Sequence, residues 1–235
     1  MSSFYYKSGE LYCENVNLSD VADQFYTPAY VYSKEKIKSN AKAYVESFEK
    51  KQNLACFSVK SLNNISILKI IKDSGCGFDI VSGGELHRVL SVGADPKTII
   101  FSGVGKSKDE IKEGILNKIL SFNVESASEL YKIEKVAKEL SIVASISIRF
   151  NPDIDSGGHD YITTGRKGDK FGITSKANLT QVKTEKQRLR SGTIVHSTIF
   201  VLQLHGYSTN YSKLYFLPIK EFLGLMAMSS APLLH

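Results

Sequence analysis

The chain has 235 residues, of which 42% are hydrophobic and 23% are charged, a composition typical of a globular protein with one large domain or two small ones. Its formal net charge is +6, but residues 176–235 hold seven Lys and Arg against two Glu, so residues 1–175 are close to neutral. No stripe of basic residues interleaved with aromatics is present. The sequence therefore argues against a nucleic-acid-binding protein.

The three cysteines, Cys13, Cys56 and Cys76, show no CxxC spacing, which argues against a disulfide framework or a metal site. Free thiols of this kind fit a reducing cytoplasm. The N-terminus lacks a basic segment followed by an apolar one, and no run approaches 18 consecutive apolar residues. We therefore expect neither secretion nor membrane association.

Short β-branched runs alternate with amphipathic stretches from about residue 54, which is typical of parallel strands joined by crossover helices. The expected strands are 54–59, 78–81, 98–101, 119–124 and 143–150, and the expected helices are about 62–71, 84–92, 108–116 and 126–140. A Gly- and Asp-rich loop follows at 151–172. Five such cycles predict either a doubly wound sheet or a (β/α)8 barrel.

Local motifs refine this prediction. No Gly-x-Gly-x-x-Gly follows the first strand, which disfavours a dinucleotide-binding sheet, and the Gly pair at 103 and 105 is interpreted as a tight turn. Ser126 and Glu129 have the spacing of a capping box. Ser82 with residues 83–85 is expected to cap and start the second helix.

Lys60 stands at the end of the first expected strand, and the carboxyl ends of parallel strands face the active site in such folds. A lysine that is partly desolvated there loses its proton more readily and can form a Schiff base. The alternative is a solvated lysine that begins the next helix. Position alone leaves both interpretations open.

The segments around this lysine resemble the fold-type III pyridoxal-phosphate decarboxylases, and more closely the diaminopimelate decarboxylases. The resemblance covers about residues 27–173. The segments that carry it are ACFSVKSLN at 55–63, GFDIVSGGEL at 77–86, IFSGVGK at 100–106, FNVES at 122–126, RFNPDID at 149–155, YITTG at 161–165 and KFGI at 170–173.

This resemblance implies a lysine-biosynthetic carboxy-lyase that converts meso-2,6-diaminopimelate to L-lysine and CO2. Lys60 would hold pyridoxal 5'-phosphate as an internal aldimine, and the cofactor would act as an electron sink. The implied fold is a partial (β/α)8 barrel of the alanine racemase and decarboxylase type, without the family's C-terminal β-domain. The full-length family implies a homodimer that acts on a small amino-acid substrate.

Asp79 lies at the end of the second strand and Arg149 at the end of the fifth, and the resemblance implies that both lie close to the cofactor lysine and to each other. We therefore predict that Lys60, Asp79 and Arg149 bind the cofactor, with Lys60 also catalytic. The alternative for Asp79 and Arg149 is a structural ion pair that fixes the strand ends.

The resemblance ends near residue 173, so we expect an N-terminal segment at 1–33, an incomplete barrel at 34–175 and a basic tail at 176–235. His196 and His205 do not stand in the family's histidine motif and receive no role. A frameshifted or prematurely ended reading frame and a divergent tail both remain open. With at most one more strand, at 198–204, the barrel cannot close, which predicts poor solubility and no turnover by this chain alone.

Three other functions remain open. One is a single-domain pyridoxal-phosphate-binding barrel with a role in cofactor homeostasis. Another is a non-enzymatic remnant that binds an intact decarboxylase subunit. A third is a decarboxylase of the same fold that acts on ornithine, arginine or a carboxylated polyamine.

Overall fold

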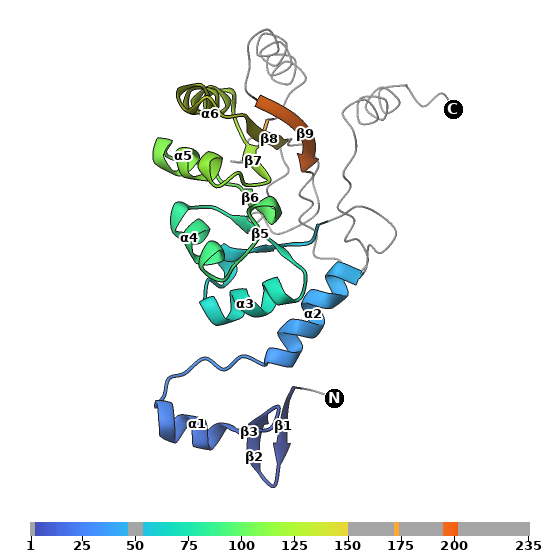
Figure 1. Ribbon diagram of the computed structural model, residues 1–235. Helices are drawn as coiled ribbons and strands as arrows, with labels where there is room; N and C mark the ends of the chain where they lie inside the picture. Colours follow the sequence, from blue (N-terminus) through green and yellow to red (C-terminus); the bar gives the residue numbers. More distant parts are fainter. Residues whose placement is uncertain (1–2, 47–53, 150–171, 174–194, 202–235) are drawn as a thin grey trace, which may run out of the picture.

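The main body of the computed structural model is a six-stranded parallel sheet with helices along one side (Figure 1). The structure describes residues 3–46, 54–149, 172–173 and 195–201. The strands are β4 (Cys56–Ser58), β5 (Gly77–Ile80), β6 (Ile99–Phe101), β7 (Ser121–Val124), β8 (Ala144–Arg149) and β9 (Val195–Val201). The helices between them are α3 (Ile65–Asp73), α4 (Gly83–Ser91), α5 (Lys108–Leu116) and α6 (Ala127–Leu140). Short 3-10 turns, η1 (Val59–Ser61) and η2 (Pro96–Thr98), follow β4 and precede β6.

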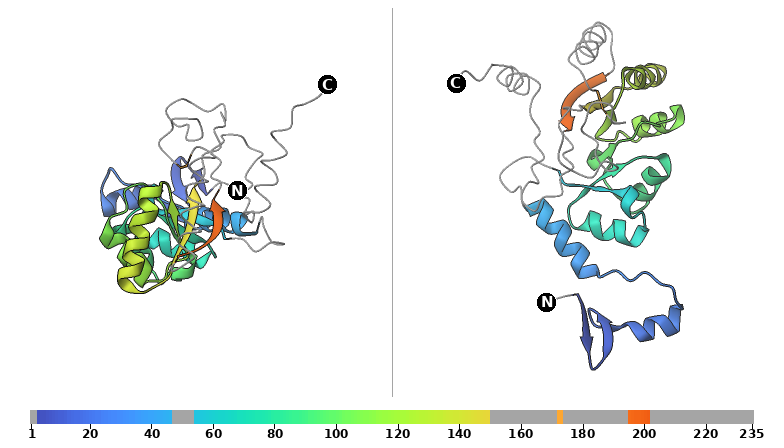
Figure 2. Two further views of the ribbon diagram at one scale, coloured as in Figure 1. Left: turned by 90° about the horizontal axis from the view of Figure 1, so that it is seen from above. Right: turned by 180° about the vertical axis from the view of Figure 1, so that it is seen from behind.

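The strand order decides between the two predicted architectures. The order is β4-β5-β6-β7-β8-β9, so each strand lies beside the strand that precedes it in the chain. A doubly wound sheet reverses its order at a switch point, whereas a (β/α)8 barrel adds each strand in sequence. The described strands therefore have the order of a partial barrel, and α3 to α6 lie along its outer side (Figure 2).

The predicted elements agree with this order, with small shifts at their ends. The helix expected at 108–116 coincides with α5 (Lys108–Leu116), and β5 to β8 fall within one or two residues of the predicted limits. The sixth strand is β9 (Val195–Val201), three residues before the predicted 198–204, and it extends the sheet past residue 175, where we expected the barrel segment to end. The loop expected at 151–172 lies outside the described residues, except for Gly172.

The hydrophobic core lies between the sheet and its helices. Phe78, Phe101 and Phe122, from three neighbouring strands, are almost completely buried there, and the rings of the last two stack with centroids 5.9 Å apart. Burial of one such side chain stabilises a fold by about 1.5–3 kcal/mol relative to exposure. The helices contribute the apolar faces that the periodicity predicts, including Leu68, Leu86, Val89, Ile111 and Ile133.

The opposite face of the sheet is polar. Side chains alternate between the two faces of a strand, and residues paired in register point to the same side. Ser58 pairs with Asp79, and Asn123 pairs with Ser147, so these four share the face away from the phenylalanines. This face would line the interior of the barrel, and in such folds the active site lies at the carboxyl end of that interior.

Side-chain caps start the helices that follow these strands. The prediction for Ser82 is confirmed, because its hydroxyl accepts from the amide of Glu85 at 3.2 Å and α4 begins at Gly83. The capping box predicted at Ser126 is half correct. Ser126 accepts from the amide of Glu129 at 3.2 Å, but the Glu129 carboxylate accepts from the amide of Glu125 at 2.8 Å, one residue before the cap. This carboxylate also binds a buried lysine, which sets its direction.

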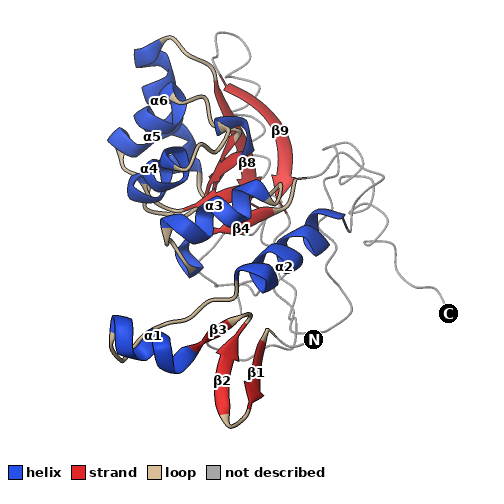
Figure 3. Ribbon diagram, turned by 60° about the horizontal axis from the view of Figure 1, so that its bottom comes forward, coloured by secondary structure: helices blue, strands red, loops and turns tan. Residues whose placement is uncertain are grey.

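A small antiparallel sheet precedes the main sheet. It consists of β1 (Phe4–Lys7), β2 (Glu10–Cys13) and β3 (Val16–Asn17), and it continues into α1 (Leu18–Phe25). Figure 3 shows this unit apart from the six-stranded sheet, with α2 (Lys34–Glu46) between them in the chain. None of the helices in the described ranges is both long enough and apolar enough to cross a membrane.

Candidate active site

Lys60 lies at the carboxyl end of β4, in the turn η1. The turn is held by the Ser61 hydroxyl, which donates to the carbonyl of Ser58 at 2.7 Å, and by the amide of Leu62, which donates to the carbonyl of Val59 at 3.1 Å. Val59 is fully buried, whereas Lys60 is exposed. The turn therefore anchors the backbone of the lysine and leaves its amine accessible to a ligand.

Asp79 lies on β5, the next strand, where it is half-buried among hydroxyl donors. Its register partner Ser58 donates to Oδ2 at 3.3 Å, and the Ser102 hydroxyl donates to Oδ1. The turn η1 that carries Lys60 also lies against β5. The chain thus places an amine and a carboxylate at neighbouring strand ends and fixes the carboxylate by two hydrogen bonds.

Asn123, on β7, continues this set of contacts. Its Nδ2 donates to the Ser102 hydroxyl at 2.8 Å, and its backbone carbonyl accepts from the ammonium of Lys106 at 2.8 Å. Its Oδ1 is buried without a hydrogen-bond partner among the described residues. A buried acceptor left unpaired costs about 1–3 kcal/mol, so this amide orientation is maintained by its other contacts.

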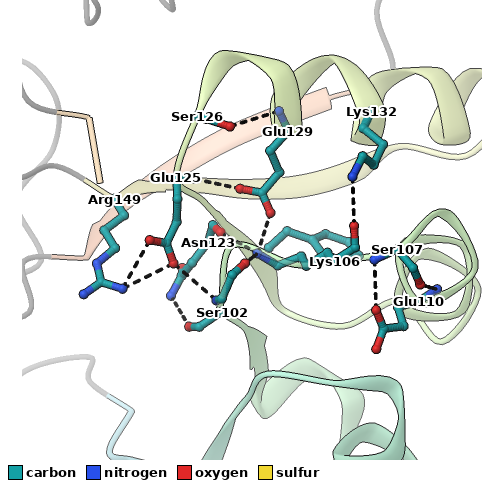
Figure 4. Close-up of polar contacts among 12 residues, drawn as sticks. Ser102, Lys106, Ser107, Glu110, Asn123, Glu125, Ser126, Glu129, Lys132 and Arg149 are labelled. Carbon is teal, nitrogen blue, oxygen red and sulfur yellow. Dashed lines mark hydrogen bonds and ion pairs between the residues drawn. The ribbon is translucent and has the colours of Figure 1, made fainter. Parts of the chain in front are cut away.

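Arg149, at the end of β8, binds Glu125 just after β7 (Figure 4). Its Nη1 lies 3.2 Å from Oε1 and 3.4 Å from Oε2 of that carboxylate, and the amide of Gly103 donates to Oε1 at 3.2 Å. The two side chains are 16% and 2% exposed. Removal of one partner from a buried pair costs about 3–5 kcal/mol, because the other charge stays buried.

Lys106 is the most deeply buried charge at this edge, with a side chain that is 0% exposed. Its ammonium donates to the carbonyls of Gly103 and Asn123 at 2.7 and 2.8 Å, and to the Glu129 carboxylate at 2.7 Å. An ammonium has three donors, so all of them are used. Lys106 therefore ties the loop after β6 to β7 and to the start of α6 (Figure 4).

The structure places all three predicted residues, Lys60, Asp79 and Arg149, at the carboxyl ends of their strands. Lys60 and Asp79 lie on adjacent strands, and the ion pair of Arg149 is with Glu125. Sequence reasoning assigned no role to Glu125 or to Lys106. Glu125 stands directly after β7, the same signal that identified Lys60, whereas Lys106 lies in the loop between β6 and α5 and carried no such signal.

Cys56 lies two residues before Ser58, on the same strand and next to the site. Burial, together with the negative charges of Asp79 and Cys76, raises the pKa of the Cys56 thiol to about 12. A thiol with this pKa stays protonated at neutral pH and is a poor nucleophile. We therefore assign no nucleophilic role to Cys56.

The described residues also contain no cluster of three or more His, Cys, Asp or Glu that could hold a metal ion.

A family model for the pyridoxal-binding domain of pyridoxal-dependent decarboxylases matches residues 34–196, which is more than half of the chain. The chain belongs to this family. The match includes Lys60, Asp79 and Arg149 and continues to the second residue of β9. Members of the pyridoxal-dependent decarboxylase family use pyridoxal phosphate, as the resemblance implied.

Several curated relatives are diaminopimelate decarboxylases. The Pseudomonas aeruginosa enzyme is 45% identical over 173 residues, which cover 74% of this chain and 42% of that protein. The Haemophilus influenzae enzyme is 46% identical over 174 residues, with the same two shares. The chain therefore spans about 42% of the length of these relatives.

Solved structures agree with the fold. The diaminopimelate decarboxylase from M. jannaschii in complex with L-lysine is 33% identical, with a TM-score of 0.76, over 85% of this chain and 48% of that chain. The Helicobacter pylori enzyme (I148L mutant) complexed with L-lysine is 35% identical, with a TM-score of 0.68, over 76% of this chain and 45% of that chain. The partial barrel thus corresponds to part of the fold of these enzymes.

The described residues of this decarboxylase-family chain fit pyridoxal phosphate. An exposed primary amine at Lys60 matches the aldehyde of the cofactor, and the polar face offers the Asp79 carboxylate and the Ser58 hydroxyl on the same and the adjacent strand. The fixed orientation of Asp79 suits a ligand that must be held in one position. Lys60 and Asp79 are the residues that would hold the cofactor at β4 and β5.

We predict that Cys56 is the slowest of the three cysteines to react with iodoacetamide at pH 8 in the native chain. With a pKa of about 12, the Cys56 thiolate fraction at pH 8 is about 10⁻⁴. Because burial is the largest cause, unfolding in urea lowers this pKa and should raise the rate. Mass spectrometry of the alkylated peptides measures the rates. Rapid labelling of Cys56 in the native chain would contradict this prediction.

Proposed function

We propose that this chain is the cofactor-bearing part of a diaminopimelate decarboxylase, which converts meso-2,6-diaminopimelate to L-lysine and CO2 with pyridoxal phosphate bound at Lys60. The observation that carries the proposal is the position of this lysine at the carboxyl end of β4, beside an oriented carboxylate on β5. The relatives named diaminopimelate decarboxylase support the choice of substrate. Two structures of such enzymes contain L-lysine, the product of the proposed reaction.

The chain's own residues have three tasks in this proposal. The Lys60 amine would hold the cofactor, and its Nζ would also take or give a proton at the reacting carbon. Asp79, fixed by Ser58 and Ser102, presents a carboxylate in one orientation. Bound pyridoxal phosphate supplies an electron sink for the pair left when a carboxylate departs as CO2.

Arg149 contributes positive charge at the same edge of the sheet. Its contact with Glu125 fixes the guanidinium at the end of β8, where it would face an anionic group on the cofactor or the substrate. Since Glu125 also accepts from the amide of Gly103, the loop after β6 and the end of β8 are joined. We assign Arg149 a binding role and Glu125 the role of positioning it.

We further propose that the complete protein is a cytoplasmic homodimer that takes a small amino-acid substrate. Free thiols at Cys13, Cys56 and Cys76 support a reducing compartment. The carboxyl-edge residues support an anionic amino-acid ligand. The part of the substrate remote from the reacting amine would be bound by residues outside the described part of the chain.

We expect that reduction with sodium borohydride in the presence of pyridoxal phosphate attaches a phosphopyridoxyl group to Lys60. Peptide mass spectrometry locates the label, and Lys60→Ala should lose it. Lys69→Ala is the matched control, because Lys69 is also exposed and its ion pair with Asp73 lies at 3.5 Å on the surface. Equal labelling of many surface lysines, or full labelling of Lys60→Ala, would refute the proposed cofactor site.

We also expect that the purified 235-residue chain does not release L-lysine from meso-diaminopimelate and is largely aggregated. The physical reason is that, within the described residues, the outer edges of β4 and β9 pair with no further strand. Liquid chromatography of the reaction measures lysine, and sedimentation measures the soluble fraction. Steady lysine release by this chain alone would contradict this expectation and would show that these 235 residues suffice for catalysis. Release of an amine from ornithine or arginine instead would redirect the substrate assignment.

A further inference from the structure

A row of hydrogen bonds crosses the carboxyl ends of four neighbouring strands and converges on Asp79. Ser58, at the end of β4, donates to Oδ2 at 3.3 Å. Ser102, directly after β6, donates to Oδ1, and Asn123 on β7 donates from Nδ2 to the Ser102 hydroxyl at 2.8 Å. Two hydroxyls therefore donate directly to the Asp79 carboxylate, and Asn123 donates to one of these hydroxyls.

The Ser102 hydroxyl has one proton, and it donates this proton to the Asp79 carboxylate. If the Asn123 amide were turned over, its Oδ1 would face Ser102 and compete with Asp79 for this proton. The structure has the other orientation, in which Nδ2 faces Ser102 and Oδ1 is left buried without a partner among the described residues. The Asn123 Oδ1 therefore accepts no hydrogen bond from Ser102, and the Ser102 hydroxyl donates to the Asp79 carboxylate instead.

The backbone on both sides of the row is fixed. The Ser102 amide donates to the carbonyl of Ile80 at 2.7 Å, which ties it to the strand that carries Asp79. The Asn123 carbonyl accepts from Lys106 at 2.8 Å, within the buried ion pair with Glu129. The backbone positions of Ser102 and Asn123 are therefore fixed beside the strand that carries Asp79.

We propose that Ser102 and Asn123 are positioning residues that act on the cofactor through Asp79. This inference rests on the proposed function. Neither residue needs to touch the cofactor. Ser102 sets the direction of the Asp79 carboxylate toward the ligand held at Lys60, and Asn123 keeps the Ser102 proton pointed at Asp79.

The test is the affinity for pyridoxal phosphate, measured by absorbance titration on the soluble protein, together with the position of the bound cofactor's absorption band. We expect Ser102→Ala to weaken binding about tenfold, the usual effect of a lost hydrogen bond to a charged group. Asn123→Asp should weaken it at least as much, because the new carboxylate competes for the Ser102 proton. Ser102→Thr keeps the hydroxyl and should restore binding and the band.

Ser121→Ala is the matched control. Ser121 is buried on the same strand as Asn123 and forms a hydroxyl pair with Ser147 at 2.6 Å, and within the described part of the chain it forms no hydrogen bond with Asp79. Its loss should leave the affinity within about twofold of the unmodified chain, because a neutral hydroxyl pair contributes little and acts on no ligand.

The decisive measurement is a double-mutant cycle. If Ser102 acts through Asp79, Ser102→Ala should cause no further loss of affinity in an Asp79→Ala background. Equal losses in both backgrounds, or a loss in Ser121→Ala as large as in Ser102→Ala, would overturn the positioning role. If the unmodified chain binds no pyridoxal phosphate at Lys60, both the proposed function and this inference fail. If it binds the cofactor but the cycle shows equal losses, only the positioning role fails.

Discussion

The buried ammonium of Lys106 is the contact on which the geometry of the candidate site depends most. Its three hydrogen bonds reach the loop after β6, strand β7 and the first turn of α6. The second oxygen of Glu129 then accepts from the amide of Glu125, and the Glu125 carboxylate binds Arg149. One fully desolvated charge therefore fixes the positions of Asn123 and Glu125, and through them the polar groups at four strand ends. A charge in this position is stable only while all its partners are present.

The second constraint is the parallel register, which gives the sheet two different faces. One face buries phenylalanine and isoleucine against α3 to α6, and this burial supplies most of the stabilisation. The other carries Ser58, Asp79, Asn123 and Arg149, which do not pack against helices. The helix-covered face therefore holds the strands in place, and the polar face is free to bind a charged ligand near Lys60. A barrel of this type thus separates the residues that stabilise the fold from the residues that form the site.

The sequence predicted those features that depend on local chemistry. The helix 108–116 was placed correctly because its ends are marked by polar residues, and Ser107 with Glu110 forms a complete capping box there. Because the carboxyl ends of parallel strands lie at the same edge of a sheet, the sequence also predicted that Lys60, Asp79 and Arg149 lie at that edge. The ion pair between Arg149 and Glu125 could not be predicted, because a position at a strand end does not show which side chains from different strands meet. The direction of the Glu129 side chain was also beyond prediction, since it depends on Lys106, 23 residues away.

The most direct test of this account is the free energy of unfolding of Lys106→Met, measured by urea denaturation beside Lys108→Met. Lys108 is a fair control because its ion pair with Glu139 lies at 2.8 Å on the surface, with side chains 57% and 43% exposed. The account predicts a loss of about 3–5 kcal/mol for Lys106→Met, because Glu129 is left buried without its partner, and about 1 kcal/mol or less for Lys108→Met. Equal, small losses for both variants would show that the buried ammonium does not hold the strand ends together.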